Sequence, residues 1–356
     1  MSQRNSLLVV GTATIGEPLI GLCCHFKQRL GIDEVLFYKK TPLLIDRSKV
    51  VDLINRGARL AADSDQIAAF EEIDLKVSLT REEALAAARV VIDCTPAASE
   101  HKEQWYRPFA DNTHLFVAQG NIVEFGEPYA RGINDSILPD LADKYLQVVS
   151  CNTHNIAELI GTLGLTTEGD NNLRVGRFVC LRRANDISQD ERYVPSPTPY
   201  PHDDKRFGTH HARDAWRLFN TLGHDLSLFS SAVKLNSQFM HLVHFHLEID
   251  APLSREQIVS RLETNDRIAM TYKTSSNTIF SFGRDHGFFG RILNQCVVPY
   301  HGLHLSADGR EITGTSFTPQ DGNSLLSSVA ATVWALYPET YEKIIQCLRP
   351  YFFQEV

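Results

Sequence analysis

Residues 7–16 read LLVVGTATIG, and this stretch decides the fold of the N-terminal part of the chain. Leu7–Val10 form a short apolar run of the kind found in buried strands, and the run ends at Gly11. Helically spaced apolar residues follow from Glu17 to Leu30. This order predicts a strand, a tight turn at the glycine and then a helix.

The same alternation continues along the next hundred residues. Apolar runs that read as strands lie at 35–38, 90–93 and 115–118, and a helix-forming stretch lies at 81–89. Strands that alternate with helices favour a parallel, doubly wound sheet. We therefore expect an α/β, Rossmann-type domain over residues 1–150.

The pattern changes after residue 150. Strand-like segments at 177–181 and 242–249 are separated by loops rich in Pro, His and Asp, including a long polar loop at 193–211. This indicates an α+β domain with a mainly antiparallel sheet over residues 151–322. The apolar, helically spaced residues 324–336 predict a C-terminal helical segment, about 323–356, that packs back on the first domain.

Composition narrows the classes of function. The 356 residues are 43% hydrophobic and carry a net charge of −8, which gives no general reason to bind nucleic acid or an anionic membrane. We see no export signal and no apolar run of the roughly 20 residues that cross a bilayer. The seven cysteines form no C-x-x-C pair, so we expect free thiols, a cytoplasmic setting and no metal.

The glycine turn is placed where a dinucleotide-binding fingerprint belongs. Gly11, Thr14, Ile15 and Gly16 would contact a pyrophosphate, although Ala13 replaces the middle glycine and a plain strand-to-helix turn remains the alternative. Lys39-Lys40-Thr41 follow the second strand, and no carboxylate stands at that strand end. Basic residues there favour NADP, or use of both NADP and NAD; solvated lysines are the alternative.

Cys151 is the candidate nucleophile. Residues 147–150 end an apolar run, and helical spacing follows at 156–163, so Cys151 would begin a helix. A helix N-terminus lowers a thiol pKa, and its amides, with the Asn152 side chain, would hold a negative oxygen. An inert buried cysteine remains the alternative.

Histidines and arginines elsewhere supply the other groups that aldehyde chemistry needs. In a strand, His244 and His246 would share one face while His241 points to the other, and a histidine beside the cysteine would act as a base. Two histidines on one face also suggest a metal pair, but no second ligand cluster accompanies them. The pairs Arg182-Arg183 and His210-His211 would bind a substrate phosphate, or the arginines are a solvated strand end.

Two short motifs carry a resemblance to a known family. Residues 91–96 read VIDCTP and residues 148–153 read VVSCNT. Both match signatures of the archaeal-type (class II) glyceraldehyde-3-phosphate dehydrogenases, which this chain resembles. Weaker matches lie at Gly11, Lys40-Thr41, Gln119-Gly120, Arg182-Arg183, His210-His211 and 239–241.

The resemblance implies a Rossmann domain, a catalytic domain with an antiparallel sheet, a homotetramer and NADP or NAD as cofactor. It places Cys151 on the nucleophile and His241 on the catalytic histidine, whereas an alignment shifted by three residues nominates His244. It implies cofactor contacts from Gly11, Thr14, Ile15, Gly16, Lys40, Thr41, Cys94, Thr95, Pro96, Gln119, Gly120 and Asn294, and substrate contacts from Asn152, Thr153, His154, Arg182, Arg183, His210 and His211.

The implied reaction is the oxidation of a phosphorylated aldehyde. The Cys151 thiolate would attack the aldehyde, His241 would accept the hydroxyl proton, and hydride transfer would leave an acyl thioester that phosphate or water releases. The chain departs from the family pattern at Ala13, after Lys40-Thr41, after Gly120 and at His154. A dehydrogenase for another aldehyde or semialdehyde, or a non-catalytic cofactor-binding relative, therefore stays open.

Overall fold

The computed structural model describes residues 4–186, 193–319 and 321–356. The chain divides into two compact units, each formed by several stretches of sequence. The first unit consists of Met1–Glu127, Leu138–Val148 and Ser327–Arg349, and the second consists of Pro128–Ile137, Val149–Leu326 and Pro350–Val356. This division differs from the sequence-based boundaries in giving residues 128–137 and 350–356 to the second unit, so the predicted C-terminal segment 323–356 is shared between the two units.

The first unit is built on an eight-stranded sheet of order β4-β3-β2-β1-β5-β6-β8-β7. The pairings from β4 through to β8 are parallel, which confirms the predicted Rossmann-like α/β fold. Leu7 in β1 lies opposite Val35 on one side and Val90 on the other, so β1 is central and fully buried. The strands are β1 (Ser6–Val10), β2 (Glu34–Tyr38), β3 (Arg59–Ala62), β4 (Leu79–Thr80), β5 (Val90–Asp93), β6 (Leu115–Gln119), β7 (Glu127–Tyr129) and β8 (Tyr145–Val148).

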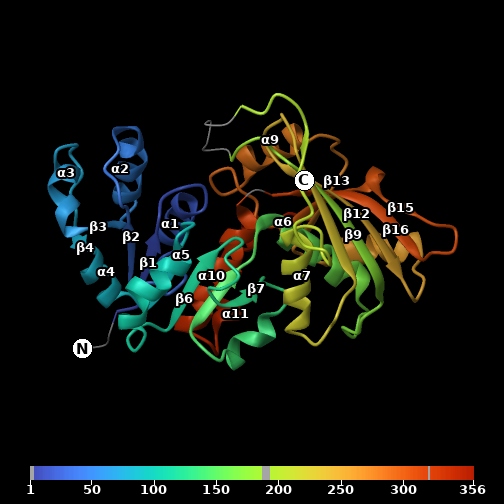
Figure 1. The fold of residues 1–356 in the computed structure, drawn as a ribbon, viewed down its shortest axis with the longest axis horizontal. Helices are drawn as coiled ribbons and strands as arrows, with labels where there is room; N and C mark the ends of the chain where they lie inside the picture. Colours follow the sequence, from blue (N-terminus) through green and yellow to red (C-terminus); the bar gives the residue numbers. More distant parts are fainter. Residues whose placement is uncertain (1–3, 187–192, 320) are drawn as a thin grey trace. The chain divides into compact units, whose positions relative to one another are not determined.

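Helices flank this sheet, as Figure 1 shows in blue and cyan. Helix α4 begins with a capping box, in which Thr80 and Glu83 satisfy each other's backbone N–H groups. The predicted helix at 17–30 is shorter in the structure, because residues 26–31 form turns that end at Gly31 with φ 68°. The helices are α1 (Gly16–His25), α2 (Arg47–Asn55), α3 (Ile67–Glu71), α4 (Arg81–Ala87), α5 (Ala98–His101), α10 (Gly322–Leu336, which begins in the second unit) and α11 (Tyr341–Ile344).

The second unit contains a mixed, mostly antiparallel sheet of order β10-β11-β9-β12-β16-β14-β13, with β15 beside β16. Its long central strands β9, β12 and β16 are antiparallel neighbours, as Figure 1 shows. This confirms the predicted sheet. The strands are β9 (Leu173–Arg182), β10 (Thr198–Pro199), β11 (Leu228–Lys234), β12 (His241–Ile249), β13 (Ile268–Thr271), β14 (Cys296–Pro299), β15 (His304–Leu305) and β16 (Glu311–Thr318).

Helix α6 (Cys151–Leu159) packs against β12, β14, β16 and helix α7 (His210–Asn220). It continues as a π-helical turn, Ile160–Gly164. Two further helices, α8 (Arg255–Thr264) and α9 (Ser276–His286), complete the unit. The predicted loop at 193–211 is shorter than expected, because Thr209 is the N-cap of α7 and the helix already begins at His210.

Two further findings concern the chain as a whole. None of the helices in the described ranges is long and apolar enough to pass through a bilayer. The seven cysteines, all of which lie within those ranges, form no disulfide.

Candidate functional site: a pocket at the sheet switch point and a cysteine at a helix start

The turn after β1 requires glycine at two positions. Gly11 has φ 92°, and a Cβ there would lie 2.8 Å from Cγ2 of Thr95. A Cβ on Gly16 would lie 2.1 Å from the Gly11 carbonyl oxygen. The Ala13 methyl group is exposed instead, so the loss of the middle glycine leaves the shape of this turn intact.

A cavity of about 340 Å³ lies at the carboxyl ends of β1, β2 and β5 in the first unit. The strand order reverses direction between β1 and β5, and doubly wound sheets bind ligands at such a switch point. Three aromatic rings contribute to its wall, with His101 stacked on Trp105 at 3.7 Å and Tyr38 edge-on to Trp105. The lining includes Gly11, Thr12, Ala13, Tyr38, Lys39, Lys40, Thr41, Asp46, Lys49, Thr95, His101 and Trp105.

Charges at this pocket differ from the sequence-based expectation. Asp46, from the short turn Leu44–Asp46, lines the pocket and accepts contacts from Lys39 Nζ at 2.6 Å and Lys49 Nζ at 2.8 Å. Burial alone would raise the Asp46 pKa, but these two lysines lower it overall. The pocket therefore does contain a carboxylate, that of Asp46, which lies eight residues after the end of β2. Because two lysines share it, and Lys40 is exposed beside it, the pocket keeps an excess of positive charge.

Asp93, the last residue of β5, orders the next loop. Its carboxylate accepts hydrogen bonds from the Thr95 backbone N–H and hydroxyl at 2.8 and 2.7 Å, and from the Tyr106 hydroxyl at 2.5 Å. A ring nitrogen of His101 lies 2.6 Å from the same group. Thr95 is thereby fixed against the glycine turn, whereas the cofactor contact that the resemblance implied for it remains a prediction.

Several predicted cofactor positions are not part of this pocket lining: Thr14, Ile15, Gly16, Cys94, Pro96, Gln119 and Gly120. Gln119 Nε2 donates to the Ser328 hydroxyl at 2.6 Å, and its Oε1 is buried with no hydrogen-bond partner in the described structure. The Gly120 carbonyl accepts from Gln147 Nε2 at 2.7 Å. Their predicted contact with a cofactor remains a prediction.

Cys151 is the first residue of α6, as predicted, and Ser150 caps the helix by accepting from the Thr153 backbone N–H. The helix terminus predicted a lowered thiol pKa. Instead, burial raises the pKa of Cys151 to about 11. Nearby Arg183 and Arg182 lower it, whereas Asp321 and Asp186 raise it. The expected direction was wrong because desolvation of the thiolate outweighs the favourable charges.

A buried hydrogen-bond network fixes the start of α6. The Thr318 hydroxyl donates to Asn152 Oδ1 at 2.9 Å and accepts from Asn155 Nδ2 at 2.9 Å. Asn323 Nδ2 donates to the Cys151 carbonyl oxygen at 3.0 Å. The amide of Asn152 is thus oriented by the end of β16, in the turn that carries the thiol.

His241 begins β12 and is buried, whereas His244 is exposed on the opposite face of that strand. Of these two histidines, His241 is the one that lies beside Arg183. The Arg183 backbone N–H donates to His241 Nδ1 at 3.0 Å. Burial and the nearby Arg183 and Arg182 hold the His241 pKa well below its usual range. A neutral ring that accepts at Nδ1 carries its proton on Nε2, so His241 presents a donor here. The predicted role as a base would require the ring to release this bond.

Arg183 is buried beside Cys151. Its guanidinium donates to the Phe239 carbonyl at 3.0 Å and to Asp186 at 2.8 Å. Within the described ranges its Nε–H is buried without a hydrogen-bond partner. Such a donor is costly to leave unmet, and a substrate oxygen would satisfy it.

Arg182, His210 and His211 form the predicted anion cluster. No described residue accepts a hydrogen bond from the Arg182 guanidinium, which lies 5.2 Å from the Tyr200 ring centroid. Burial, with the charges of Arg182 and Arg213, lowers the His210 pKa to about 4. Burial also holds the pKa of His211 well below its usual range, together with His210, Arg182 and His241. At neutral pH the cluster therefore offers one strong cation and two neutral imidazoles.

Three other predicted site residues have structural contacts. Thr153 and His154 are fully buried in the first turn of α6, and both bond to Ser150. Asn294 is also fully buried, and its amide donates to the Asp266 and Phe353 carbonyls and accepts from the Phe353 N–H. These contacts within the protein do not test the predicted roles of the three residues toward substrate or cofactor, which remain predictions.

Sequence reasoning missed Asp321, which lies beside Cys151 in the folded unit. It is buried, has φ 67°, and precedes α10. Burial raises its pKa to about 6 against the opposing charges of Arg291 and Arg183. Nothing in the local sequence signals this, because the residues that enclose it are distant along the chain.

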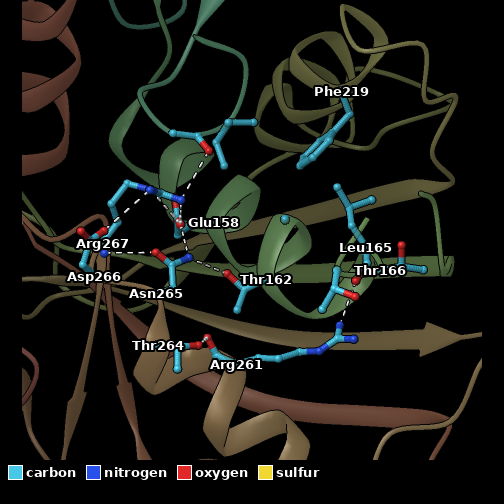
Figure 2. A pocket seen from close by; sticks show the side chains of 14 residues that line it. Glu158, Thr162, Leu165, Thr166, Phe219, Arg261, Thr264, Asn265, Asp266 and Arg267 are labelled. Carbon is cyan, nitrogen blue, oxygen red and sulfur yellow. Dashed lines mark hydrogen bonds and ion pairs between the residues drawn. The ribbon is translucent and has the colours of Figure 1, made fainter. Parts of the chain in front are cut away.

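A further cavity of about 520 Å³ lies beyond the other end of α6, around the π-helical turn (Figure 2). Its charged groups are already paired: Glu158 accepts from Asn265 at 2.6 Å and from Arg267 at 3.1 Å. Arg261 donates to the Leu165 carbonyl at 2.9 Å. No predicted site residue is among those that line it, and across the described ranges no cluster of His, Cys, Asp or Glu is arranged to hold a metal.

Comparison with known proteins gives consistent relatives. Glyceraldehyde-3-phosphate dehydrogenase of Pyrobaculum calidifontis is 26% identical over 222 residues, covering 60% of this chain and 59% of the relative. The enzyme of the same name from Methanococcoides burtonii is 26% identical over 268 residues, 70% of this chain and 73% of the relative. That of Metallosphaera sedula is 26% identical over 243 residues, 65% and 66%.

The chain is thus similar, at low identity, to the archaeal glyceraldehyde-3-phosphate dehydrogenases. No protein-family model matches it. It spans about 59% of the length of the Pyrobaculum relative, and the shared identity is low. This distant similarity agrees with the α/β fold, while the substrate has to be argued from this chain's own side chains.

Proposed function

We propose that this protein is an NAD(P)-dependent aldehyde dehydrogenase that forms a covalent thioester on Cys151. The observation that carries the proposal is the arrangement around the first turn of α6. A partly exposed cysteine starts a capped helix, and the charges of Arg182 and Arg183 act on its thiol. The Arg183 backbone is in turn bonded to His241, a histidine that presents a proton donor. A nucleophile, cations and an oxygen-directed donor are the groups that acyl-transfer chemistry uses.

The chemistry follows from what each group presents. The Cys151 thiolate forms a bond to the aldehyde carbon, and the carbonyl electron pair moves to the oxygen. His241 Nε2–H would donate to that oxygen, and the unmet Nε–H of Arg183 would stabilise the same charge. A bound nicotinamide would supply the hydride acceptor, and loss of hydride from the C–H bond would leave the carbonyl as a thioester. One proton is released overall, the one that the Cys151 thiol gives up, and it would pass to solvent. His241, already protonated on Nε2, would not have to accept it.

The anion cluster supports phosphorolysis of the thioester. Arg182 has no hydrogen-bonded carboxylate within the described structure, and His210 and His211 add neutral donors nearby. Inorganic phosphate held there would attack the thioester carbon and leave as an acyl phosphate, with the Cys151 thiolate as leaving group. The phosphorylating reaction is therefore proposed ahead of hydrolysis.

The first-unit pocket would hold the cofactor. Gly11 and Gly16 allow the backbone to approach a pyrophosphate, and Lys39, Lys40 and Lys49 outweigh Asp46 in charge. This supports NADP ahead of NAD, because the 2′-phosphate of NADP needs basic partners.

The test is stopped-flow absorbance of reduced cofactor with glyceraldehyde 3-phosphate, NADP or NAD, and phosphate. We expect a burst and steady turnover in the wild type, and neither in Cys151→Ser. Cys24→Ser, which alters a cysteine of α1 in the other unit, is the matched control and should behave like the wild type. Turnover that survives in Cys151→Ser would refute the thioester route. Cofactor binding with no turnover on any aldehyde would indicate a non-catalytic relative.

A further inference from the structure

A second cavity in the same unit lies beside the Cys151 site. It encloses about 370 Å³, in the range typical of small-molecule pockets. Its walls come from α9, from the loop that follows it, and from the ends of β12 and β16. The main lining side chains are Met240, Phe280, Phe289, Arg284, Arg291 and Asp321.

Three links along the chain connect this cavity to the reacting thiol. Met240 lines it, and the next residue is His241. Pro319 lines it, and the preceding Thr318 bonds to Asn152 beside Cys151. The Asp321 carboxylate lines it and lies close enough to Cys151 to influence the thiol. The cavity and the thiol therefore share a boundary.

Backbone strain gathers at this cavity. Four described residues other than glycine have positive φ, and three of them are Phe239 (79°), Phe289 (45°) and Asp321 (67°). Phe289 and Asp321 line the cavity, and the Phe239 ring lies 4.9 Å from that of Phe280. Bulky residues rarely adopt this conformation, and such strain concentrates at ligand-binding sites. Phe289 is also 50% exposed, which folding alone does not explain.

Charges at the cavity are already paired within the protein. Arg284 donates twice to Asp285, at 2.7 and 2.9 Å. Arg291 donates to the Phe289 carbonyl at 2.6 Å and lies 3.5 Å from Asp321. With two cations balanced by two carboxylates and aromatic rings at the wall, the cavity suits an uncharged apolar group. A phosphate would have to displace these pairs.

We infer that this cavity binds the body of the aldehyde substrate, and that the substrate class is aldehydes with an uncharged aromatic or branched apolar body. The inference rests on the proposed function, because it places the aldehyde carbon at Cys151. It assigns the Arg182 cluster to inorganic phosphate instead of a substrate phosphate. Phe280 and Phe289 are then the residues that determine specificity.

The first test compares kcat/KM for benzaldehyde, acetaldehyde and glyceraldehyde 3-phosphate. We expect benzaldehyde to be the best substrate, and Phe280→Ala to lower its kcat/KM about tenfold through lost apolar contact, with acetaldehyde nearly unaffected. Phe289→Ala gives the same test at a position where the ring is half-exposed. Tyr272→Ala, which removes a 70% exposed aromatic ring of the same unit, is the control and should change nothing.

The second test needs neither cofactor nor turnover. Mass spectrometry follows the rate at which Cys151 is alkylated by 2-bromoacetophenone and, separately, by iodoacetamide. The ratio of the first rate to the second is then compared with the same ratio for N-acetylcysteine, which has no pocket. We expect the phenyl reagent to be favoured about tenfold in the wild type and in Tyr272→Ala, and this preference to disappear in both phenylalanine variants.

The outcomes separate the two proposals. Preference for glyceraldehyde 3-phosphate, or a phenyl preference that survives both phenylalanine substitutions, would overturn the pocket assignment and leave the Cys151 dehydrogenase intact. Absence of turnover on every aldehyde, together with phenyl-selective alkylation that the variants abolish, would overturn the proposed reaction and keep the pocket.

Discussion

At the scale of single residues, the reactivity of Cys151 is set by charges of opposite effect. Arg183 and Arg182 favour its thiolate, while burial, Asp321 and Asp186 oppose it. The balance leaves the thiol mostly protonated in the free protein at neutral pH, because its pKa is about 11. For the proposed reaction, a bound substrate or cofactor would therefore have to alter this environment before the thiolate forms.

The pH dependence of alkylation tests this balance. Between pH 7 and 9 the rate of Cys151 modification by iodoacetamide should rise about tenfold per pH unit, without a plateau, because each unit below the pKa changes the thiolate fraction tenfold. Asp321→Asn removes a negative neighbour and should lower the pKa, so alkylation at a given pH becomes faster. Arg182→Gln removes a positive neighbour and should make it slower.

Asparagine is the appropriate replacement at 321, because it tolerates the left-handed backbone that Asp321 adopts. The measurement is the second-order rate at several pH values, with Cys151 identified by peptide mass. A plateau near pH 7, or equal rates in the two variants, would contradict the assignment of these charges.

The sequence predicted part of this site and missed the rest for physical reasons. Cys151 at a helix start and His241 facing away from His244 follow from local periodicity, and the structure confirms both placements. The pKa of the thiol and the presence of Asp321 depend on burial by segments that are far apart along the chain. Local patterns carry no information about that burial.

At the scale of elements, the strand-turn-helix unit β1–α1 depends on close packing. Gly11 and Gly16 meet across the turn with no room for a side chain between them. Gly21, in the same helix, has open space where a Cβ would be. Gly16 therefore has no room for a side chain, whereas Gly21 could carry one.

Gly16→Ala and Gly21→Ala form a matched pair of variants. Gly16→Ala should reduce the free energy of unfolding by about 2 kcal/mol or more, because the Gly11 carbonyl must move. Gly21→Ala should raise it by roughly 0.5–1 kcal/mol, because alanine favours a helix where space allows. Urea denaturation measures both, and equal effects would show that the turn is looser than described.

Strands were predicted better than helices. The runs at 35–38, 90–93 and 115–118 became β2, β5 and β6 because continuous apolar residues suit a buried parallel sheet. The predicted loop at 193–211 overlaps the first two residues of α7, because the histidine pair there reads as polar loop sequence.

At the scale of the whole molecule, the nucleotide pocket and the Cys151 site belong to different units of the chain. Cofactor binding to the first unit should therefore survive loss of the thiol. We expect NADP to raise the melting temperature of wild type and Cys151→Ser equally, by roughly 5 °C at about 100 times its Kd.

The lysines of the pocket should decide which cofactor stabilises more. NAD should give a smaller shift than NADP at equal concentration, and Lys40→Ala should reduce this difference, while Lys76→Ala, an exposed lysine of the same unit outside the pocket, should not. Differential scanning fluorimetry measures the shift that each of the two cofactors gives in the wild type and in both variants. A larger shift with NAD would reverse the assignment of the basic cluster.

The homotetramer implied by the family resemblance remains a prediction, which light scattering can compare with four times the 40.0 kDa chain. No feature of a single chain's sequence periodicity specifies such an assembly. A boundary between two units was easier to predict from the sequence, because the strand pattern changes from continuous apolar runs to alternating residues near residue 150. In the structure the second unit resumes at Val149.

The positive φ angles of Phe239 and Phe289 have a consequence for how this protein would change in a laboratory evolution experiment. Glycine adopts these angles without strain, so clones chosen only for survival after heating would gain by exchanging either ring for glycine. Clones chosen for turnover of bulky aldehydes would lose by the same exchange. The two selections would thus favour different residues at positions 239 and 289. Phenylalanine at both positions in the present sequence is the outcome expected from selection for turnover.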